Sequence, residues 1–370
     1  METKPKVIAF YLPQYHRFHE NDEWWGKGFT EWTNVARAKP LYKGHNQPKI
    51  PADLGFYDLR LPSVGVEQAE LAKEAGIYGF CYWHYWFGNG KQLMSCVFDN
   101  VLSSGAPNFP FCLAWANHSW YAKNWNSNDA GRKDKLLIEQ KYPGDDDIRK
   151  HYEYALKAFK DKRYIKKDGK PVFLIYQPND IPANFMELWN KWSKEDGFEG
   201  GIYFIARYVP KDYKETESQF YIKKGFSAVL PERFWRHIYM SRKNHFIYRI
   251  KLFFYEHFSF GMPSKFKYSD IYKYFTDSTL DKDEHVIPTL VPNFDHSPRS
   301  KKAGYILDGA FPSLFGKLCR LMFKNIQGKE NDFVWLKSWN EWGEGNYMEP
   351  DLQFGKGFIQ ELRKSLDEIS

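Results

Sequence analysis

Eight short apolar runs recur along the 370-residue chain, and polar or aromatic residues bound each of them. Stretches with helical periodicity separate several of these runs, at 66–75, 148–159, 181–192 and 358–369. Strands that alternate with helices indicate a parallel sheet, and eight such units fit a (β/α)8 TIM barrel better than an open doubly wound sheet. The predicted strands are residues 7–12, 78–83, 111–116, 172–176, 203–208, 227–230, 286–291 and 333–336.

The segment after the first strand also favours the barrel. An open nucleotide-binding sheet usually carries a glycine-rich phosphate turn there, whereas this chain has Leu12-Pro-Gln-Tyr-His16. We expect residues 1–370 to form one α/β barrel domain with extended loops and an insertion at 233–284, before the seventh strand. Within the insertion, 247–258 is aromatic and basic. It is either a helix packed on the barrel or a segment that contacts a membrane surface or a lipid-linked substrate.

The chain is unusually rich in aromatic residues, with 14 Trp, 25 Tyr and 31 Phe making up 19% of the sequence. This exceeds what a core requires, so we expect a binding surface on which sugars, bases or another protein could stack. The net charge is +7, and the lysines and arginines are interspersed with 46 acidic residues instead of forming a continuous basic block. Nucleic acid is therefore not the expected partner.

Cysteine usage and hydropathy indicate the compartment. The four cysteines form no CxxC pair, which fits a reducing environment. The first residues lead into a strand without the apolar segment of a secretion signal, and no run approaches about 18 apolar residues. We expect a cytoplasmic protein. A peripheral membrane contact through the insertion would be at the inner face of the membrane.

Chemically capable side chains follow nearly every predicted strand. Because barrel enzymes build their sites at the carboxyl ends of their strands, we expect these side chains to contact the substrate. Asp295 has a second interpretation, since it could instead cap the loop before Ser297 and Pro298. The predicted substrate-binding residues are Tyr11, Tyr15, His16, Glu31, Trp32, Tyr82, Trp83, His84, Trp115, Asn117, His118, Tyr176, Arg207, Asp295 and Trp342.

The eighth strand runs directly into the most distinctive cluster, Trp339-Asn-Glu-Trp-Gly-Glu-Gly345. Glu341 and Glu344 stand three residues apart among tryptophans and glycines. Glycosidic chemistry needs such a pair, one carboxyl to give or take a proton and a second of different pKa, together with flat apolar surfaces for the sugar. The plainer alternative is a solvated acidic loop. We predict that Glu341 and Glu344 are catalytic.

Other kinds of site are poorly supported. No HExxH or similarly paired histidines suggest a metal, and no GxSxG turn suggests a serine hydrolase. The string at 145–147 resembles the metal-binding motif of nucleotide-sugar transferases, but capping of a helix explains it adequately. We expect neither a metal nor a cofactor.

Five motifs together resemble the WbsX-like proteins of bacterial polysaccharide clusters, which are themselves similar to glycoside hydrolase family 99. The likeness spans nearly the whole chain. It implies a (β/α)8 barrel that acts on a polysaccharide or oligosaccharide, with α-mannoside-like sugars among its substrates. The motifs are Ala9-Phe-Tyr-Leu-Pro-Gln-Tyr-His16, Gly28-Phe-Thr-Glu-Trp32, Gly79-Phe-Cys-Tyr-Trp-His-Tyr-Trp86, Phe111-Cys-Leu-Ala-Trp-Ala-Asn117 and the Trp339–Gly345 cluster with Glu349-Pro350.

The resemblance also implies roles for the two acids. Glu341 would take the proton from the sugar 2-hydroxyl, so that this oxygen attacks through a 1,2-anhydro intermediate with net retention. Glu344 would be the acid/base that serves the leaving group, and we therefore expect its pKa to be raised. The chain departs from the pattern at His118, where related sequences carry an acid. Hydrolysis and glycosyl transfer both remain open, and the alternative to an enzyme is a carbohydrate-binding barrel.

Overall fold

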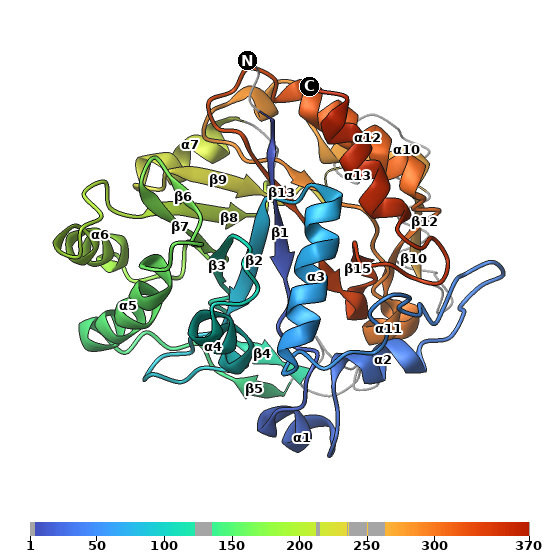
Figure 1. The fold of residues 1–370 in the computed structure, drawn as a ribbon, viewed down its shortest axis with the longest axis horizontal. Helices are drawn as coiled ribbons and strands as arrows, with labels where there is room; N and C mark the ends of the chain where they lie inside the picture. Colours follow the sequence, from blue (N-terminus) through green and yellow to red (C-terminus); the bar gives the residue numbers. More distant parts are fainter. Residues whose placement is uncertain are drawn as a thin grey trace.

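The protein is described from a computed structural model that covers residues 4–122, 135–211, 215–234 and 263–369, with 236 and 250 as single residues. Eight parallel strands form the centre (Figure 1), in chain order. They are β1 (Lys6–Tyr11), β2 (Gly79–His84), β3 (Phe111–Trp115), β7 (Lys170–Ile175), β8 (Tyr203–Tyr208), β9 (Ala228–Pro231), β11 (Thr289–Leu290) and β13 (Phe333–Leu336).

The ring of strands is nearly closed. β13 pairs with β1 on one side and β11 on the other. The remaining gap is bridged where Val229 of β9 accepts a hydrogen bond from Ile287 N and donates one to His285 O, both at 2.8 Å. The predicted TIM barrel is therefore confirmed. β11 is shorter than expected because Pro288 and Pro292 flank it and cannot donate to a ladder.

Helices cover the outside of the barrel (Figure 1), and four of them coincide with predicted ones. Those four are α3 (Pro62–Ala75), α5 (Asp145–Phe159), α6 (Phe185–Glu195) and α13 (Gly357–Asp367). The pattern missed α4 (Ser95–Ser104), α7 (Glu215–Lys223) and α12 (Pro312–Asn325).

Strand alternation decides which side chains enter the barrel. In β1, Phe10 stacks on Trp83 at 4.5 Å and also contacts Trp335, so these rings fill the interior. The next residue, Tyr11, points the opposite way and donates a hydrogen bond to Gln68 of α3. Inward-facing residues near the carboxyl ends of the strands therefore form the floor of the opening at that end of the barrel, which we call the mouth.

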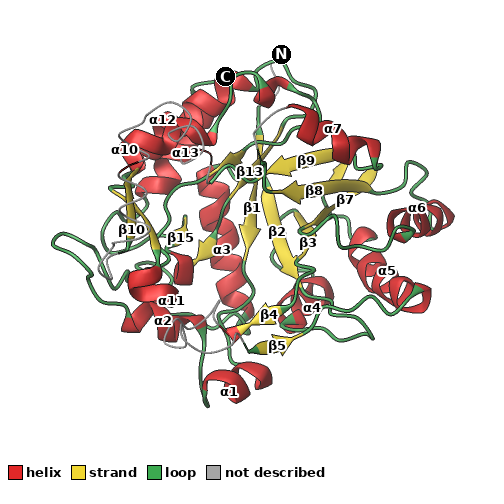
Figure 2. Cartoon of the chain, turned by 180° about the vertical axis from the view of Figure 1, so that it is seen from behind, coloured by secondary structure: helices red, strands yellow, loops and turns green. Residues whose placement is uncertain are grey.

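The loops at that mouth carry short elements of their own. Figure 2 shows α1, α2, β4 and β5 at the end toward which β1 and β2 point. With the other short elements outside the ring of strands, they are α1 (His19–Trp25), α2 (Glu31–Arg37), β4 (Trp120–Tyr121), β5 (Leu136–Ile138), β10 (Ser264–Lys267), α10 (Tyr268–Ile271), α11 (Ser297–Ser300), β12 (Tyr305–Asp308), β14 (Asn340–Glu341) and β15 (Asn346–Tyr347). At the other end, β6 (Lys166–Lys167) pairs with β7.

The described part of the expected insertion contains β10, α10 and two short 3-10 helices between 272 and 282. The aromatic segment 247–258 lies outside the described residues apart from Ile250. No helix in the described ranges is both long and apolar enough to span a lipid bilayer.

Candidate active site

A tight hairpin after β13 positions the two predicted catalytic acids. β14 pairs with β15, and a 3-10 helix of residues Trp342–Glu344 connects them. A β-carbon on Gly343 would lie 2.0 Å from a carboxylate oxygen of Glu31. Gly345 has a φ of 53°, and a β-carbon there would lie 2.7 Å from Cβ of Asp295. Both glycines are therefore needed for the hairpin to fit against neighbouring loops.

Arg299 holds the Glu344 carboxylate. Its Nη1 donates to Glu344 Oε1 at 2.7 Å, while its Nε donates to Glu31 Oε2 at 3.0 Å. Burial would raise the pKa of Glu344, but Arg299 and Lys337 outweigh it and lower the pKa well below the usual range. Glu344 is consequently ionised in the free protein.

Glu341 has the opposite environment. Its Oε1 accepts a hydrogen bond from Trp83 Nε1 at 3.2 Å. Burial and the neighbouring Glu344 raise the pKa of Glu341 to about 7. This corrects the expectation that Glu344 would hold the proton. Arg299 stabilises charge on Glu344 directly, whereas the attraction of Lys337 and Arg299 for Glu341 does not offset its burial and the repulsion by Glu344.

Further charged residues extend the site across the mouth. Lys337 Nζ lies 3.7 Å from Glu232 Oε2, and Arg207 Nη2 donates to the same oxygen at 3.4 Å. The Arg207 guanidinium lies over the Tyr176 ring, 4.3 Å from its centre. Although burial opposes ionisation, Lys337 and Arg207 lower the pKa of Glu232. These side chains come from four different strand ends and form one polar network beside Glu341 and Glu344.

His118, the departure from the family pattern, lies next to this network. Its ring centre is 5.1 Å from that of Tyr176. Burial and the positive charge of Arg207 lower the pKa of His118 to about 4, so the imidazole is neutral at neutral pH. The preceding Asn117 is buried and bonds both backbone groups of Gln177, so it braces the loop after β7.

A buried layer supports the acidic hairpin from below. The Tyr15 hydroxyl accepts a hydrogen bond from Gly343 N, and the Trp342 ring stacks on Tyr347 at 3.7 Å. Glu349 accepts hydrogen bonds from Trp342 Nε1 at 2.6 Å, from Gln68 and from Tyr57. Trp32 packs against Tyr15 and Trp342. Tyr15, Trp32 and Trp342 therefore position the site without facing its mouth.

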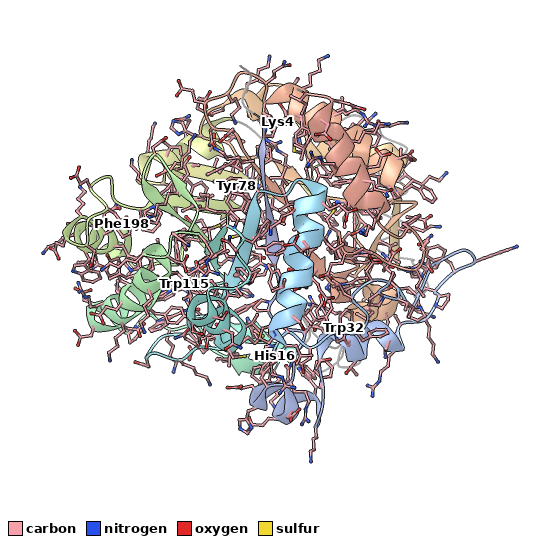
Figure 3. All side chains as sticks on the ribbon, viewed as in Figure 1. Lys4, His16, Trp32, Tyr78, Trp115 and Phe198 are labelled. Atoms are coloured by element: carbon pink, nitrogen blue, oxygen red, sulfur yellow. The ribbon has the colours of Figure 1, made fainter. Side chains whose placement is uncertain are left out.

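Four predicted substrate contacts instead lie between the strands and the helices. Tyr82 packs on Phe98 of α4, and His84 lies 2.9 Å from His151 of α5. Trp115 stacks on Phe185 of α6 and lies far from Trp32, on the other side of α3 in Figure 3. The prediction that Tyr11, Tyr82, His84 and Trp115 contact substrate is corrected, because strand alternation directs all four outward.

Three other residues that were predicted to contact substrate are instead held by neighbouring protein groups. Glu31 is fully buried against Arg299. His16 is buried with its Nε2 3.3 Å from Cys96 Sγ. Asp295 accepts a hydrogen bond from Ser297 N at 3.0 Å, which is the capping alternative for this residue. Of the predicted residues, the structure brings together Trp83, His118, Tyr176, Arg207, Glu341 and Glu344 at the mouth.

The sequence interpretation did not select Arg299 and Lys337. A pair of buried acids needs nearby positive charge, so a basic residue after a strand was the available signal. Lys337 directly follows β13, but Arg299 lies in α11 and nothing in its local sequence distinguishes it. In the described residues, no group of three His, Cys, Asp or Glu side chains could hold a metal ion.

Comparisons with known proteins agree with this architecture. The chain is 33% identical to uncharacterized protein WxcX of Xanthomonas campestris pv. campestris strain B100, over 99% of this chain and 50% of that protein. A second strain's WxcX, also 33% identical, matches over the same shares. The chain thus spans about half the length of these relatives.

Two solved structures share the fold. A glycoside hydrolase-like protein has a TM-score of 0.59 at 16% identity, covering 98% of this chain and 94% of that one. The family 99 endo-alpha-mannosidase from Bacteroides thetaiotaomicron has a TM-score of 0.57 at 14% identity, covering 98% and 96%. The family model described as glycosyltransferase WbsX matches residues 7–362. The chain therefore belongs to the WbsX glycosyltransferase family of carbohydrate-active enzymes.

Proposed function

We propose that Glu341 and Glu344 make or break a glycosidic bond of a bacterial surface polysaccharide, such as a lipopolysaccharide glycan, or of its precursor. The observation that carries this proposal is the pairing of two buried carboxyls with opposite pKa shifts at the barrel mouth. The reaction is transfer of the WbsX type or family 99-like hydrolysis or transglycosylation, with retention. The relatedness in fold to an endo-alpha-mannosidase supports α-mannosides as the first substrates to test.

In the proposed reaction the two acids share one proton. Glu341 accepts the proton of the 2-hydroxyl, O2 attacks C1, and Glu344 protonates the oxygen that leaves. In the second half, Glu344 takes a proton from water or an acceptor hydroxyl, whose oxygen opens the 1,2-anhydro ring. Glu341 then returns its proton to O2. Two inversions at C1 give net retention.

In the free protein the proton is on the other acid from the one that this reaction needs, so it must move first. The proton lies on Glu341 in the free protein because Arg299 holds Glu344 ionised. The two carboxyls interact directly, so the proton can pass from Glu341 to Glu344 as substrate enters. Glu341 is then ionised, and the positive charge of Lys337 stabilises it because the two groups lie within electrostatic reach of each other.

The shared proton predicts the pH dependence. The pair loses its proton as the pH rises through about 7, the pKa of Glu341. We expect kcat/KM to fall tenfold per pH unit above that value and to remain nearly constant between about pH 5 and 6. Initial rates measured from pH 5 to 9 test this. Activity that rises through pH 7 would mean that the doubly ionised pair is the active form.

The function itself is tested with a panel of α-linked mannosides and deoxyhexosides, with and without acceptor alcohols. We expect a released or transferred sugar with the natural chain and none with Glu341→Gln. Binding without turnover in both proteins would instead support the carbohydrate-binding barrel. Lipid-linked acceptors, a peripheral membrane contact and the single-domain organisation with its 233–284 insertion also belong to this proposal.

A further inference from the structure

A pocket lies beside the hairpin that carries the two acids. It has a volume of about 430 Å³ and lies between the loop after β1, the β10–β12 pair and β15. In Figure 1 these three strands lie on the same side of the barrel. Neither Glu341 nor Glu344 lines the pocket; its residues include Tyr42, Lys49, Lys267, Asp308, Phe311 and Phe354.

The Tyr347 ring lines this pocket and belongs to the β14–β15 hairpin that carries the two catalytic acids. It stacks on Trp342 at 3.7 Å, and Lys49 Nζ lies 5.3 Å from its centre. On the same wall, Asp295 N donates to Glu344 O at 2.7 Å. The pocket therefore adjoins the catalytic residues but is lined by its own charged groups.

Protein groups already engage the carboxylates of this pocket. Asp295 Oδ2 lies 2.8 Å from His45 Nε2 and accepts from Gln47 Nε2 at 2.6 Å. Asp351 accepts from the Tyr347 hydroxyl at 2.6 Å and from the backbone N–H of Phe354. Asp308, the third acid, accepts from the Tyr42 hydroxyl and pairs with Lys265 at 3.5 Å. These acids therefore have little remaining capacity to bind a ligand cation.

The two lysines that line the pocket, unlike its acids, lack hydrogen-bond partners in the part of the chain that the structure describes. Within the described residues, neither Lys49 Nζ nor Lys267 Nζ forms an ion pair or a hydrogen bond. Lys49 is half-buried and is attracted by Asp295 and Asp351, whose oxygens are already engaged by the contacts above, while Lys267 is exposed. An anion in the pocket would supply charge-assisted hydrogen bonds to both groups.

Aromatic rings complete the lining. Phe311 is 49% exposed and packs edge-to-face with Phe354 at 5.8 Å. Such a pair offers an apolar surface beside the lysines, and a pocket with a few convergent polar groups on apolar walls suits a small ligand. We propose that this pocket binds an anionic sugar, a hexuronate or a sugar phosphate, with its charge at Lys49 and Lys267 and its ring on Phe311. Binding here does not depend on the proposed reaction.

Calorimetric titration of the full chain carrying Glu341→Gln tests the proposal without turnover. The probes are glucuronate, glucose 1-phosphate, neutral glucose and inorganic phosphate. We expect at least one anionic sugar to bind about tenfold more tightly than glucose and inorganic phosphate, with an affinity that falls as salt is added. Tighter binding of glucose 1-phosphate assigns a phosphate ligand, and tighter binding of glucuronate assigns a carboxylate.

Lysine variants locate the binding site. Lys49→Met should weaken the anionic sugar about tenfold or more, and Lys49→Arg should retain most of the affinity. The control is Lys157→Met, at an exposed lysine of α5, which should change nothing. An unchanged circular dichroism spectrum shows that each variant is folded. An affinity for glucuronate and for glucose 1-phosphate that is no higher than for glucose, no effect of Lys49→Met, or no heat with any probe would overturn the proposal.

Discussion

Replacing Glu344 with glutamine is expected to lower kcat/KM on a poor leaving group by about 10²- to 10⁴-fold, because general acid assistance is lost. The loss should be much smaller on an activated aryl glycoside, whose oxygen departs without a proton. Glu341→Gln should be equally severe on both substrates, since neither can react until the 2-hydroxyl loses its proton. Initial rates on the two classes of substrate measure the difference.

The matched control for these variants is Glu153→Gln, at an exposed glutamate of α5 that pairs with Arg149. It should leave both rates unchanged. A 2-deoxy or 2-fluoro substrate should bind without turnover, because it has no 2-hydroxyl to attack. If both Gln variants at the mouth kept full activity on a natural glycan, the catalytic groups would lie elsewhere and the assignment of Glu341 and Glu344 would fail.

Arg299→Met is expected to have the largest effect on folding. Arg299 is 9% exposed and contacts Glu31, which is fully buried. Removing one partner of a buried ion pair leaves an uncompensated charge, and the expected loss in the free energy of unfolding is about 3–5 kcal/mol. The pKa of Glu344 should also rise, because Arg299 no longer stabilises its charge. Urea unfolding monitored by tryptophan fluorescence measures the stability.

Two controls distinguish the ion pair from the loss of packing. Arg299→Met combined with Glu31→Gln should recover part of the stability, since the buried charge of Glu31 is gone in the double variant. Burial already raises the pKa of Glu31 despite Arg299. Without Arg299 that pKa rises further, so the stability of the single variant should increase as the pH falls and Glu31 takes up a proton. Equal losses in the single and double variants would show that the charge of Glu31 is unimportant.

The barrel could be predicted because its signal is local. Each strand is a short apolar run followed by a change in character, and eight such runs specify the closed sheet. The direction of each aromatic side chain was harder to assign. Trp83 and Trp115 both lie near the ends of their strands, yet Trp83 contacts Glu341 whereas Trp115 packs on α6. One residue of difference in strand register places a ring inside or outside the barrel.

The charge state of the acids could not be predicted from their own segment. Glu341 and Glu344 are three residues apart, but the guanidinium that donates a hydrogen bond to Glu344 belongs to Arg299, 45 residues earlier in the chain. That contact depends on how α11 packs against the hairpin. The pKa order of the two acids is therefore a tertiary property, and the sequence indicated which residues are acidic without indicating which one carries the proton.

The central claim is that this pair acts at an anomeric carbon with net retention. Proton NMR of the first-formed product, recorded before mutarotation, tests it most directly on an α-mannoside that turns over. The account predicts that the newly formed hemiacetal or transferred glycoside first appears as the α-anomer. Initial appearance of the β-anomer would mean a single inverting displacement and would contradict the proposed roles of Glu341 and Glu344.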